Sequence, residues 1–366
     1  MPSSLIVEVC EIEKIIPHDN ADKLEIAQIK GWFCITQKGI YKAGDKVVYA
    51  PPESVIPEEL ADKMNVKNYL RGGSRVKTIK LRGVYSEGLI IPVSFLKEDK
   101  PIGTDVSEEL GIAKYVPAVS KGSNNGGKGA PVKRISDERF KKYTDIENFK
   151  NYSKTFNEDD IVIVSEKIHG TNSRFSKFED TSLWGRICNF FGCPKTVIRA
   201  GSHNVMLNDP RKNKYYEKSK KNIYWETALK YVERLPIGYQ VFGEIYGESV
   251  QWLTYDAPDC QKFLAFDVMK DGQYLDYDDF KEFCEEYCIP TVPELYRGKF
   301  NSEVIHKLAN ENSFLNPECI REGVVIRPEF ETKNHKMGRV ILKYISERYR
   351  EYVDSKNKED NVEDEY

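Results

Sequence analysis

The sequence has no long apolar run, few cysteines and almost no net charge. None of its 366 residues belongs to an uncharged apolar stretch of about 18 residues, so it offers no candidate for a helix that spans a membrane. Acidic Glu8, Glu11 and Glu13 stand near the start, where a secretory signal would be basic and then apolar. We therefore expect an intracellular protein of the cytoplasm or nucleus, without a signal peptide or a transmembrane segment.

Cysteine, at eight residues, is too sparse to build a disulfide scaffold. The closest pairs are Cys188 with Cys193 and Cys284 with Cys288, and neither has the spacing of a zinc knuckle. The near balance of 55 basic and 58 acidic residues excludes a chain that is basic overall, so an anionic partner would have to meet local patches. With 40% apolar residues, the chain is not disordered as a whole.

What the sequence does contain falls into segments of different composition. Residues 1–118 show short strand-like runs separated by glycine-containing breaks, which favours a small β-barrel such as the OB-fold. Residues 119–131 are rich in Gly, Ser and Asn and are predicted to form a flexible linker. Residues 132–350 alternate strand and helix patterns, with helices expected at Tyr215–Arg234 and Tyr277–Tyr287, and the acidic tail 351–366 is expected to be disordered.

Two runs concentrate positive charge. The second of them, Arg211–Lys221, contains six basic residues and one acid. The first, Val66–Arg82, contains no acid and six basic residues: Lys67, Arg71, Arg75, Lys77, Lys80 and Arg82. A solvated surface explains either run alone, but beside an OB-like segment the two runs together favour binding of a nucleic-acid backbone.

The most informative stretch is Ile161–Asn172, which reads IVIVSEKIHGTN. It places Lys167 at the end of a buried apolar strand, three residues before Gly170 in a tight turn. Burial favours the neutral amine of a lysine, which can attack phosphorus and form a phosphoramidate. A lysine at a strand end can equally extend its charged head to solvent, and this stretch alone leaves both interpretations open.

Four further strand-like segments carry polar residues suited to phosphate chemistry. Glu244 lies in a strand that ends at Gly247, and Glu322 stands at the head of another. These two carboxylates can hold a divalent metal through water, because hard cations take oxygen ligands. Lys343 can neutralise phosphate charge, and Phe266 in the strand FLAFDV can stack on a base. Each residue alone is a weak signal, since a carboxylate in a strand is often only exposed at an edge.

In their order and type, these pieces resemble the nucleotidyltransferase superfamily of covalent ligases and capping enzymes. Lys167–Asn172 resembles its nucleophile motif in the form used by RNA ligases. The remaining motifs follow in the expected order over about residues 160–350, at Glu244–Gly247, Phe263–Val268, Glu322–Ile326 and Ile341–Tyr344.

The subtype follows from the same motif and from the domain order. His169 and Asn172 resemble nick-sealing RNA ligases, whereas DNA ligases and capping enzymes usually carry Asp and Arg there. A barrel in front of the ligase domain resembles RNA ligases of the Naegleria and Deinococcus type, although some of that group carry Asp at the position of His169. The implied fold is α+β: an N-terminal β-barrel (OB-fold) followed by a nucleotidyltransferase domain of ATP-grasp-like antiparallel sheets with helices.

The resemblance implies an ATP-dependent RNA ligase, acting as a monomer, that seals a 3′-hydroxyl to a 5′-phosphate in a nicked duplex or a broken RNA. Lys167 would carry AMP, Glu244 and Glu322 would bind Mg²⁺ or Mn²⁺, and Lys343 would contact the α-phosphate. Asn172 and Arg199 would contact RNA ends together with the six basic residues of Val66–Arg82. The implied nucleotide-binding set is Glu166, Lys167, Ile168, Asn172, Arg199, Glu244, Phe266, Glu322 and Lys343. Because the fifth motif has Ile345 where many relatives have a second lysine, Arg339 or Lys336 would supply further phosphate contacts.

Two alternatives remain beside this interpretation. One is a DNA ligase or a capping guanylyltransferase, against which Asn172 and the position of the barrel argue. The other is a non-catalytic RNA-binding protein with a degenerate ligase domain. The joint presence of Lys167, Glu244, Glu322 and Lys343 argues against that second alternative.

Overall fold

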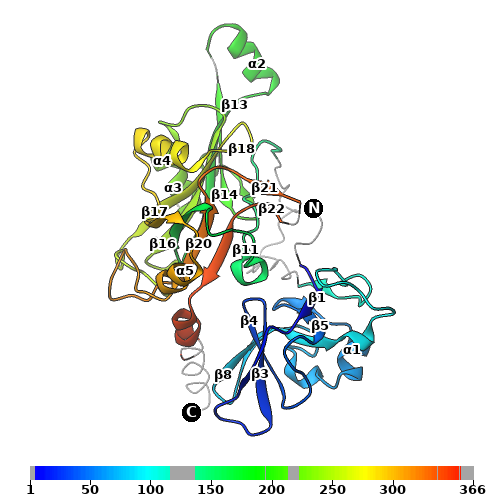
Figure 1. Ribbon diagram of the computed structural model, residues 1–366. Helices are drawn as coiled ribbons and strands as arrows, with labels where there is room; N and C mark the ends of the chain where they lie inside the picture. Colours follow the sequence, from blue (N-terminus) through cyan, green and yellow to red (C-terminus); the bar gives the residue numbers. More distant parts are fainter. Residues whose placement is uncertain are drawn as a thin grey trace, which may run out of the picture. The chain divides into compact units, whose positions relative to one another are not determined.

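The computed structural model describes residues 5–115, 137–193, 195–212, 222–335, 337–353 and 355. These residues divide into two compact units (Figure 1), the first made of 5–115 with 149–155 and the second of 137–148 with the residues from 156 onward. The expected linker 119–131 and most of the expected tail 351–366 lie outside the described residues, so both stay predictions. In the described part of the chain, no helix is long and apolar enough to cross a membrane.

The first unit is built from short antiparallel strands. One sheet has the order β1-β5-β9, a second has the order β2-β3-β4, and β7 and β8 form a hairpin. At the tip of that hairpin, Arg82 and Gly83 have φ angles of 50° and 92°, as the tight two-residue turn between right-twisted strands requires. The elements are β1 (Glu8–Glu11), β2 (Lys14–Pro17), β3 (Leu24–Ile29), β4 (Trp32–Gln37), β5 (Lys46–Ala50), β6 (Ser54–Val55), α1 (Glu58–Lys63), β7 (Thr78–Leu81), β8 (Val84–Glu87), β9 (Leu89–Pro92) and β10 (Ala113–Lys114), with short 3-10 turns η1 (Lys67–Tyr69) and η2 (Val93–Phe95).

A short segment from beyond the expected linker completes this unit. Residues 149–155, which include the turn η3 (Phe149–Tyr152), pack within it although the boundaries predicted from the sequence put them in the second domain. Lys150 Nζ lies 2.9 Å from a carboxylate oxygen of Glu87, and the two side chains are only 5% and 3% exposed. Trp32 Nε1 donates a hydrogen bond to Asn151 Oδ1 at 2.7 Å. We call residues 149–155 the clasp, because their side chains form an ion pair and a hydrogen bond with buried side chains of the first unit.

The second unit consists of two sheets. A five-stranded sheet has the order β11-β23-β20-β12-β19, and a six-stranded sheet has the order β15-β14-β13-β16-β17-β18. All neighbouring strands run antiparallel except β11 and β23. The strands are β11 (Glu147–Asn148), β12 (Ile161–Lys167), β13 (Thr171–Glu179), β14 (Thr196–Ser202), β15 (Met206–Leu207), β16 (Tyr239–Gly247), β17 (Gln261–Lys270), β18 (Gln273–Tyr274), β19 (Glu294–Lys299), β20 (Gly323–Pro328), β21 (Lys333–Asn334), β22 (Gly338–Arg339) and β23 (Leu342–Ile345).

Helices cover part of these sheets. They are α2 (Leu183–Phe190), α3 (Ile223–Val232), α4 (Tyr277–Glu286) and α5 (Ser302–Ala309), with a 3-10 turn η4 (Pro210–Lys212). Trp225 of α3 and Phe280 of α4 are fully buried in one core with Phe175 and Val241 of the six-stranded sheet. Asn222 caps α3 by accepting hydrogen bonds from two backbone amides. The prediction of α4 is confirmed to within a residue, whereas the first part of the helix expected at Tyr215–Arg234 lies outside the described residues.

Candidate active site

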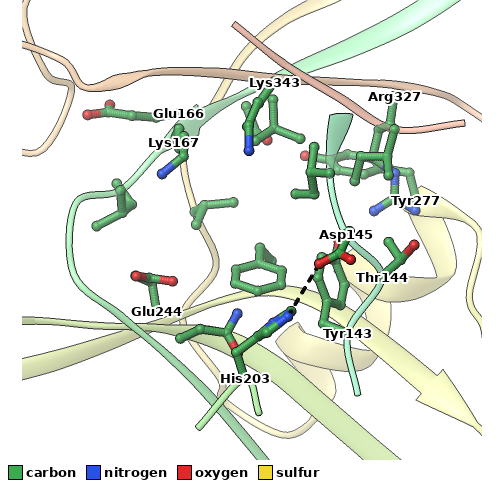
Figure 2. A pocket seen from close by; sticks show the side chains of 18 residues that line it. Tyr143, Thr144, Asp145, Glu166, Lys167, His203, Glu244, Tyr277, Arg327 and Lys343 are labelled. Atoms are coloured by element: carbon green, nitrogen blue, oxygen red, sulfur yellow. Dashed lines mark ion pairs between the residues drawn. The ribbon is translucent and has the colours of Figure 1, made fainter. Parts of the chain in front are cut away.

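A cavity of about 320 Å³ lies between the two sheets of the second unit (Figure 2). Its size suits a nucleotide or another small ligand. Strands β12, β20 and β23 of one sheet and β13, β16 and β17 of the other supply half of its lining residues. The lining residues are Tyr143, Thr144, Asp145, Ile146, Ser165, Glu166, Lys167, Ile168, Asn172, His203, Glu244, Phe266, Tyr277, Val292, Val325, Arg327, Ile341 and Lys343.

Lys167 stands where β12 ends and its ammonium group faces an acid. Nζ donates a hydrogen bond to Glu322 Oε1 at 2.6 Å, and the two side chains are 28% and 12% exposed. Burial opposes ionisation of Glu322, but the neighbouring Lys167 and His169 outweigh it and lower the pKa of Glu322 below its ordinary value. The tight turn after Lys167 needs Gly170, because a Cβ there would lie 2.2 Å from the carbonyl oxygen of Ile245. The sequence thus fixes a charged lysine–glutamate pair at the edge of the cavity.

Glu244 and Asn172 occupy paired positions on the neighbouring strands β16 and β13. Burial raises the pKa of Glu244 to about 8. Asn172 Oδ1 is buried and accepts no hydrogen bond from any described residue. This side of the cavity therefore offers a carboxyl group and an amide that lack the solvation they would have in water. A cationic or hydrogen-bonding ligand is most favourable under that condition.

The two carboxylates fit a hydrated metal ion better than a protein-built metal cage. Glu322 Oε2 is buried without a hydrogen bond from any described residue, and Glu244 faces the cavity. No group of three or more His, Cys, Asp or Glu side chains suited to a metal occurs among the residues that the structure describes. A divalent cation held here would keep water or ligand oxygens in its coordination shell, as Mg²⁺ does when bound by one or two carboxylates.

Glu166 is turned away from the cavity centre (Figure 2). It is 1% exposed, its carboxylate accepts hydrogen bonds from Ser313 Oγ and from the backbone amide of Phe314, and Arg321 Nε lies 3.6 Å from it. Burial raises the pKa of Glu166 above its ordinary value in spite of these contacts. Any contact of Glu166 with a ligand therefore falls to its backbone, and its side chain supports the loop at 313–314.

Three cationic side chains of the five-stranded sheet line the cavity, from three different strands: Lys167, Arg327 and Lys343. Arg327 was not among the residues predicted from the sequence. Its guanidinium is held by Glu331 at 2.6 Å and by Asp267 at 3.5 Å. Although Lys167 and Arg327 are each paired with a carboxylate, this wall presents the cationic hydrogen-bond donors of the cavity and is the side on which phosphate groups are favoured.

The wall made by residues 143–146 was also missed by the sequence analysis. Tyr143 donates a hydrogen bond to Asp267 Oδ2 at 2.9 Å and its ring meets Phe266 edge-on at 4.8 Å. His203 Nε2 lies 3.5 Å from Asp145 Oδ1 (Figure 2), and burial lowers the pKa of His203 even though Asp145 opposes this. This irregular segment has no strand or helix periodicity, so the sequence does not indicate that its side chains line a cavity.

Arg199 and Arg339, two arginines considered in the sequence analysis, do not line the cavity. Arg199 Nε donates to Asp137 Oδ2 at 3.0 Å. Arg339 is 7% exposed and is paired with Asp267 at 2.6 Å. Both are thus engaged in ion pairs within the second unit, and Lys336 lies outside the described residues.

The predicted basic surface of the first unit is partly neutralised by acids. Lys67 pairs with Glu58 at 2.5 Å, Arg75 pairs with Glu53 and stacks over the Tyr115 ring at 3.4 Å, and Lys77 lies 3.5 Å from Glu53. Arg71, Lys80 and Arg82 are exposed. Lys80 lies over the Tyr85 ring at 4.8 Å. The second basic run falls mostly outside the described residues.

Comparison with known proteins gives two family matches and a set of similar structures. A family model described as RNA ligase matches residues 160–345, and a model of an OB-fold domain matches residues 6–93. No curated protein matches the chain. The solved structure of Naegleria gruberi RNA ligase with PPi is 24% identical, with a TM-score of 0.69 over 96% of this chain and 98% of that chain.

Two variants of the Naegleria gruberi enzyme give similar agreement. A lysine variant with AMP and Mn, 24% identical, has a TM-score of 0.71 over 96% of this chain and 99% of that chain. Another lysine variant with ATP and Mn, also 24% identical, has a TM-score of 0.70 over 95% and 98%. At this identity the likeness concerns the fold. It confirms the predicted α+β architecture, in which an OB-fold domain precedes a sheet-rich domain with few helices.

Proposed function

Because the chain belongs to the RNA ligase family, whose model covers residues 160–345, we propose that it joins RNA ends with ATP through an AMP carried on Lys167. The observation that carries this proposal is the position of Lys167: its amine opens onto the cavity and is held by a carboxylate at 2.6 Å. Structures of the similar Naegleria gruberi enzyme with ATP or AMP and Mn support the choice of nucleotide and metal.

In the first step, Lys167 Nζ attacks the α-phosphorus of ATP. A P–N bond forms, the bond from that phosphorus to the bridging oxygen breaks, and pyrophosphate leaves. Nζ must lose a proton before it attacks, and the ionised Glu322 beside it is the group placed to take that proton. Glu322 therefore orients the nucleophile and accepts its proton.

The remaining lining residues have roles set by their chemistry. Phe266 and Ile168 offer apolar contacts for the adenine, and Lys343 and Arg327 balance charge on the phosphates. Asn172 positions the RNA 3′-end. Mg²⁺ or Mn²⁺, held through water by Glu244 and Glu322, would neutralise charge that develops on the α-phosphate.

Two further steps complete the joining reaction. AMP passes from Lys167 to the 5′-phosphate of an RNA end, and a 3′-hydroxyl then displaces AMP to form the phosphodiester. We place the exposed Arg71, Lys80 and Arg82 of the first unit in contact with the RNA backbone. The substrate is a nicked duplex or a broken RNA, and the chain acts as a monomer. Transfer of AMP from ATP separates this function from that of a capping guanylyltransferase, which would transfer GMP from GTP.

The test is a denaturing gel after incubation with α-labelled ATP and Mg²⁺ or Mn²⁺. We expect a labelled band that falls by about 10³-fold or more in Lys167→Ala, because the nucleophile is lost. Lys177→Ala is the matched control: Lys177 belongs to β13 in the same unit but does not line the cavity, and it should keep the label.

Label that persists in Lys167→Ala would assign the nucleophile elsewhere. Absence of label with either metal, on folded protein freed of AMP, would overturn the ligase activity. If the label forms, sealing of two nicked duplexes is compared, one with RNA and one with DNA at the 3′-hydroxyl side. Preference for the RNA end supports RNA joining, and preference for the DNA end supports the DNA ligase alternative.

A further inference from the structure

The segment after β23 contacts Glu322 and His169 although it lies beyond the family match, which ends at residue 345. Residues 347–353 are helical, and their start is anchored to the site. The backbone amide of Ser346 donates to the carbonyl oxygen of Glu322 at 2.9 Å, and Ser346 Oγ donates to Asn310 Oδ1 at 3.2 Å. Ser346 Oγ in turn accepts a hydrogen bond from the amide of Tyr349 at 3.2 Å. The first turn of this helix is therefore tied directly to the residue that holds the nucleophile.

Tyr349, on that helix, contacts His169. Its hydroxyl lies 3.2 Å from Nδ1 of His169, and the two rings meet edge-on at 5.7 Å. Trp252 fills the other side: its ring is 5.0 Å from that of His169 and stacks on Tyr349 at 5.5 Å, nearly parallel. The backbone amide of His169 donates to Tyr255 Oη at 2.8 Å. The imidazole is thus enclosed by two aromatic rings; its Nδ1 contacts the Tyr349 hydroxyl, and its buried Nε2 has no hydrogen bond with any described residue.

His169 is the link between Tyr349 and the nucleophile. Its Nδ1 lies 3.7 Å from Glu322 Oε2, while the other oxygen of that carboxylate accepts the hydrogen bond from Lys167 at 2.6 Å. The His169 ring therefore borders the carboxylate whose other oxygen holds Lys167. The side chains of Tyr349, His169, Glu322 and Lys167 therefore follow one another to the reacting atom, with a polar contact within 3.2 Å at each end and a longer approach of 3.7 Å between His169 and Glu322.

We propose that Tyr349 is a positioning residue for lysine adenylylation: it locks the His169 ring against Glu322 and so fixes the direction of Lys167 Nζ. This deepens the proposed function and rests on it for its kinetic readout. Neither Tyr349 nor His169 lines the cavity, so their effect reaches the nucleotide through Glu322 and Lys167. The helix 347–353 is then a working part of the site.

The kinetic test measures formation of the lysyl-AMP bond in a single turnover at several ATP concentrations. Tyr349→Phe removes one hydroxyl and keeps the ring, and it should slow the maximal rate by about three- to tenfold, the value of one hydrogen bond, with an unchanged half-saturating ATP concentration. Tyr352→Phe is the matched control: Tyr352 lies on the same helix and stacks on Trp252 at 4.9 Å, and its loss of a hydroxyl should leave the rate unchanged.

A double variant separates positioning from general support of the fold. If Tyr349 acts through His169, Tyr349→Phe combined with His169→Ala should be no slower than His169→Ala alone. Multiplicative slowing in the double variant, or a weakened half-saturation by ATP at an unchanged rate, would overturn the proposal.

A second measurement keeps the proposal independent of catalysis. Nitrogen NMR of the His169 ring in the ligand-free protein should show a shifted Nδ1 resonance in Tyr349→Phe and not in Tyr352→Phe. An unshifted resonance in Tyr349→Phe would overturn the positioning role. If wild-type protein takes no label from ATP, the proposed function fails, and the NMR comparison still decides whether Tyr349 holds His169.

Discussion

Each unit of this molecule contains a lysine–glutamate pair, and the two pairs differ in what surrounds them. In the first unit, Lys150 and Glu87 meet at 2.9 Å and are 5% and 3% exposed. In the second, Lys167 and Glu322 meet at 2.6 Å and are 28% and 12% exposed. The contact distances of the two pairs are similar, and the second lysine lines the cavity described above.

The difference shows how burial separates a structural pair from a reactive one. Both oxygens of Glu87 accept a hydrogen bond from Lys150, at 2.9 and 3.0 Å, and the Trp32 ring lies 5.3 Å from the ammonium. One oxygen of Glu322 accepts a hydrogen bond from Lys167, and the other accepts none from any described residue. A pair that is buried on all sides can only stabilise the fold. In the second pair, the lysine faces a cavity and can leave the carboxylate to contact a ligand.

The largest expected effect comes from breaking the enclosed pair. Lys150→Ala leaves a buried carboxylate without its cation, which costs about 3–5 kcal/mol of the free energy of unfolding. Amide hydrogen exchange in β5 and β9 of the full chain measures this loss in the first unit. Lys150→Met with Glu87→Gln, which removes both charges, should recover most of it. Equal losses in the single and double variants would mean that the side chains matter for packing and not for charge.

A second effect concerns Glu244, which faces the same cavity as Lys167. The folded protein keeps a proton on Glu244 up to a pKa of about 8, whereas the ordinary value is near 4.5. The native state therefore binds more protons than the unfolded chain between these values, and the free energy of unfolding falls as the pH rises through this window, by at most about 1.4 kcal/mol per pH unit.

Glu244→Gln cannot ionise and should flatten this dependence. Urea denaturation at intervals from pH 5 to pH 9, without nucleotide or metal, compares the variant with the wild type. Parallel pH profiles for the two proteins would show that burial does not hold the proton on Glu244.

The smallest effect is expected from breaking the open pair. Lys167→Ala should change the free energy of unfolding by less than about 1 kcal/mol, because Lys167 itself lines the cavity and is 28% exposed, so that water can take the place of its ammonium group beside Glu322. The same urea titration detects this in the second unit. A loss as large as that of Lys150→Ala would erase the contrast between the two pairs.

The parts of the site that the sequence predicts best are those on regular strands. Alternation along a strand puts Ser165 and Lys167 on one face of β12 and Glu166 on the other. Since Ser165 pairs with Val325, and Val325 with Lys343, the same face carries Val325, Arg327 and Lys343. The motif order identified Lys167 and Lys343. Alternation along β20, counted from Val325, would have added Arg327 to the same face.

Other parts depend on partners that the sequence does not pair. Arg199 has the residue type and the strand position expected of a ligand contact, yet Asp137, more than sixty residues earlier, engages it. Tyr143 and Asp145 lie in an irregular segment, where no periodicity predicts which side chains face a cavity. The clasp could not be predicted either. Nothing in the sequence around Lys150 and Asn151 indicates that these residues pair with Glu87 and Trp32.

The clasp also changes what can be exchanged between related proteins. A first unit taken as residues 1–118 would lack Lys150 and Asn151, the partners of Glu87 and Trp32. It is therefore not a cassette that can be cut at one boundary and grafted in front of another catalytic domain. A working graft, or a pair of co-expressed fragments, has to carry residues 149–155 with the barrel they complete, and evolution by domain shuffling faces the same condition.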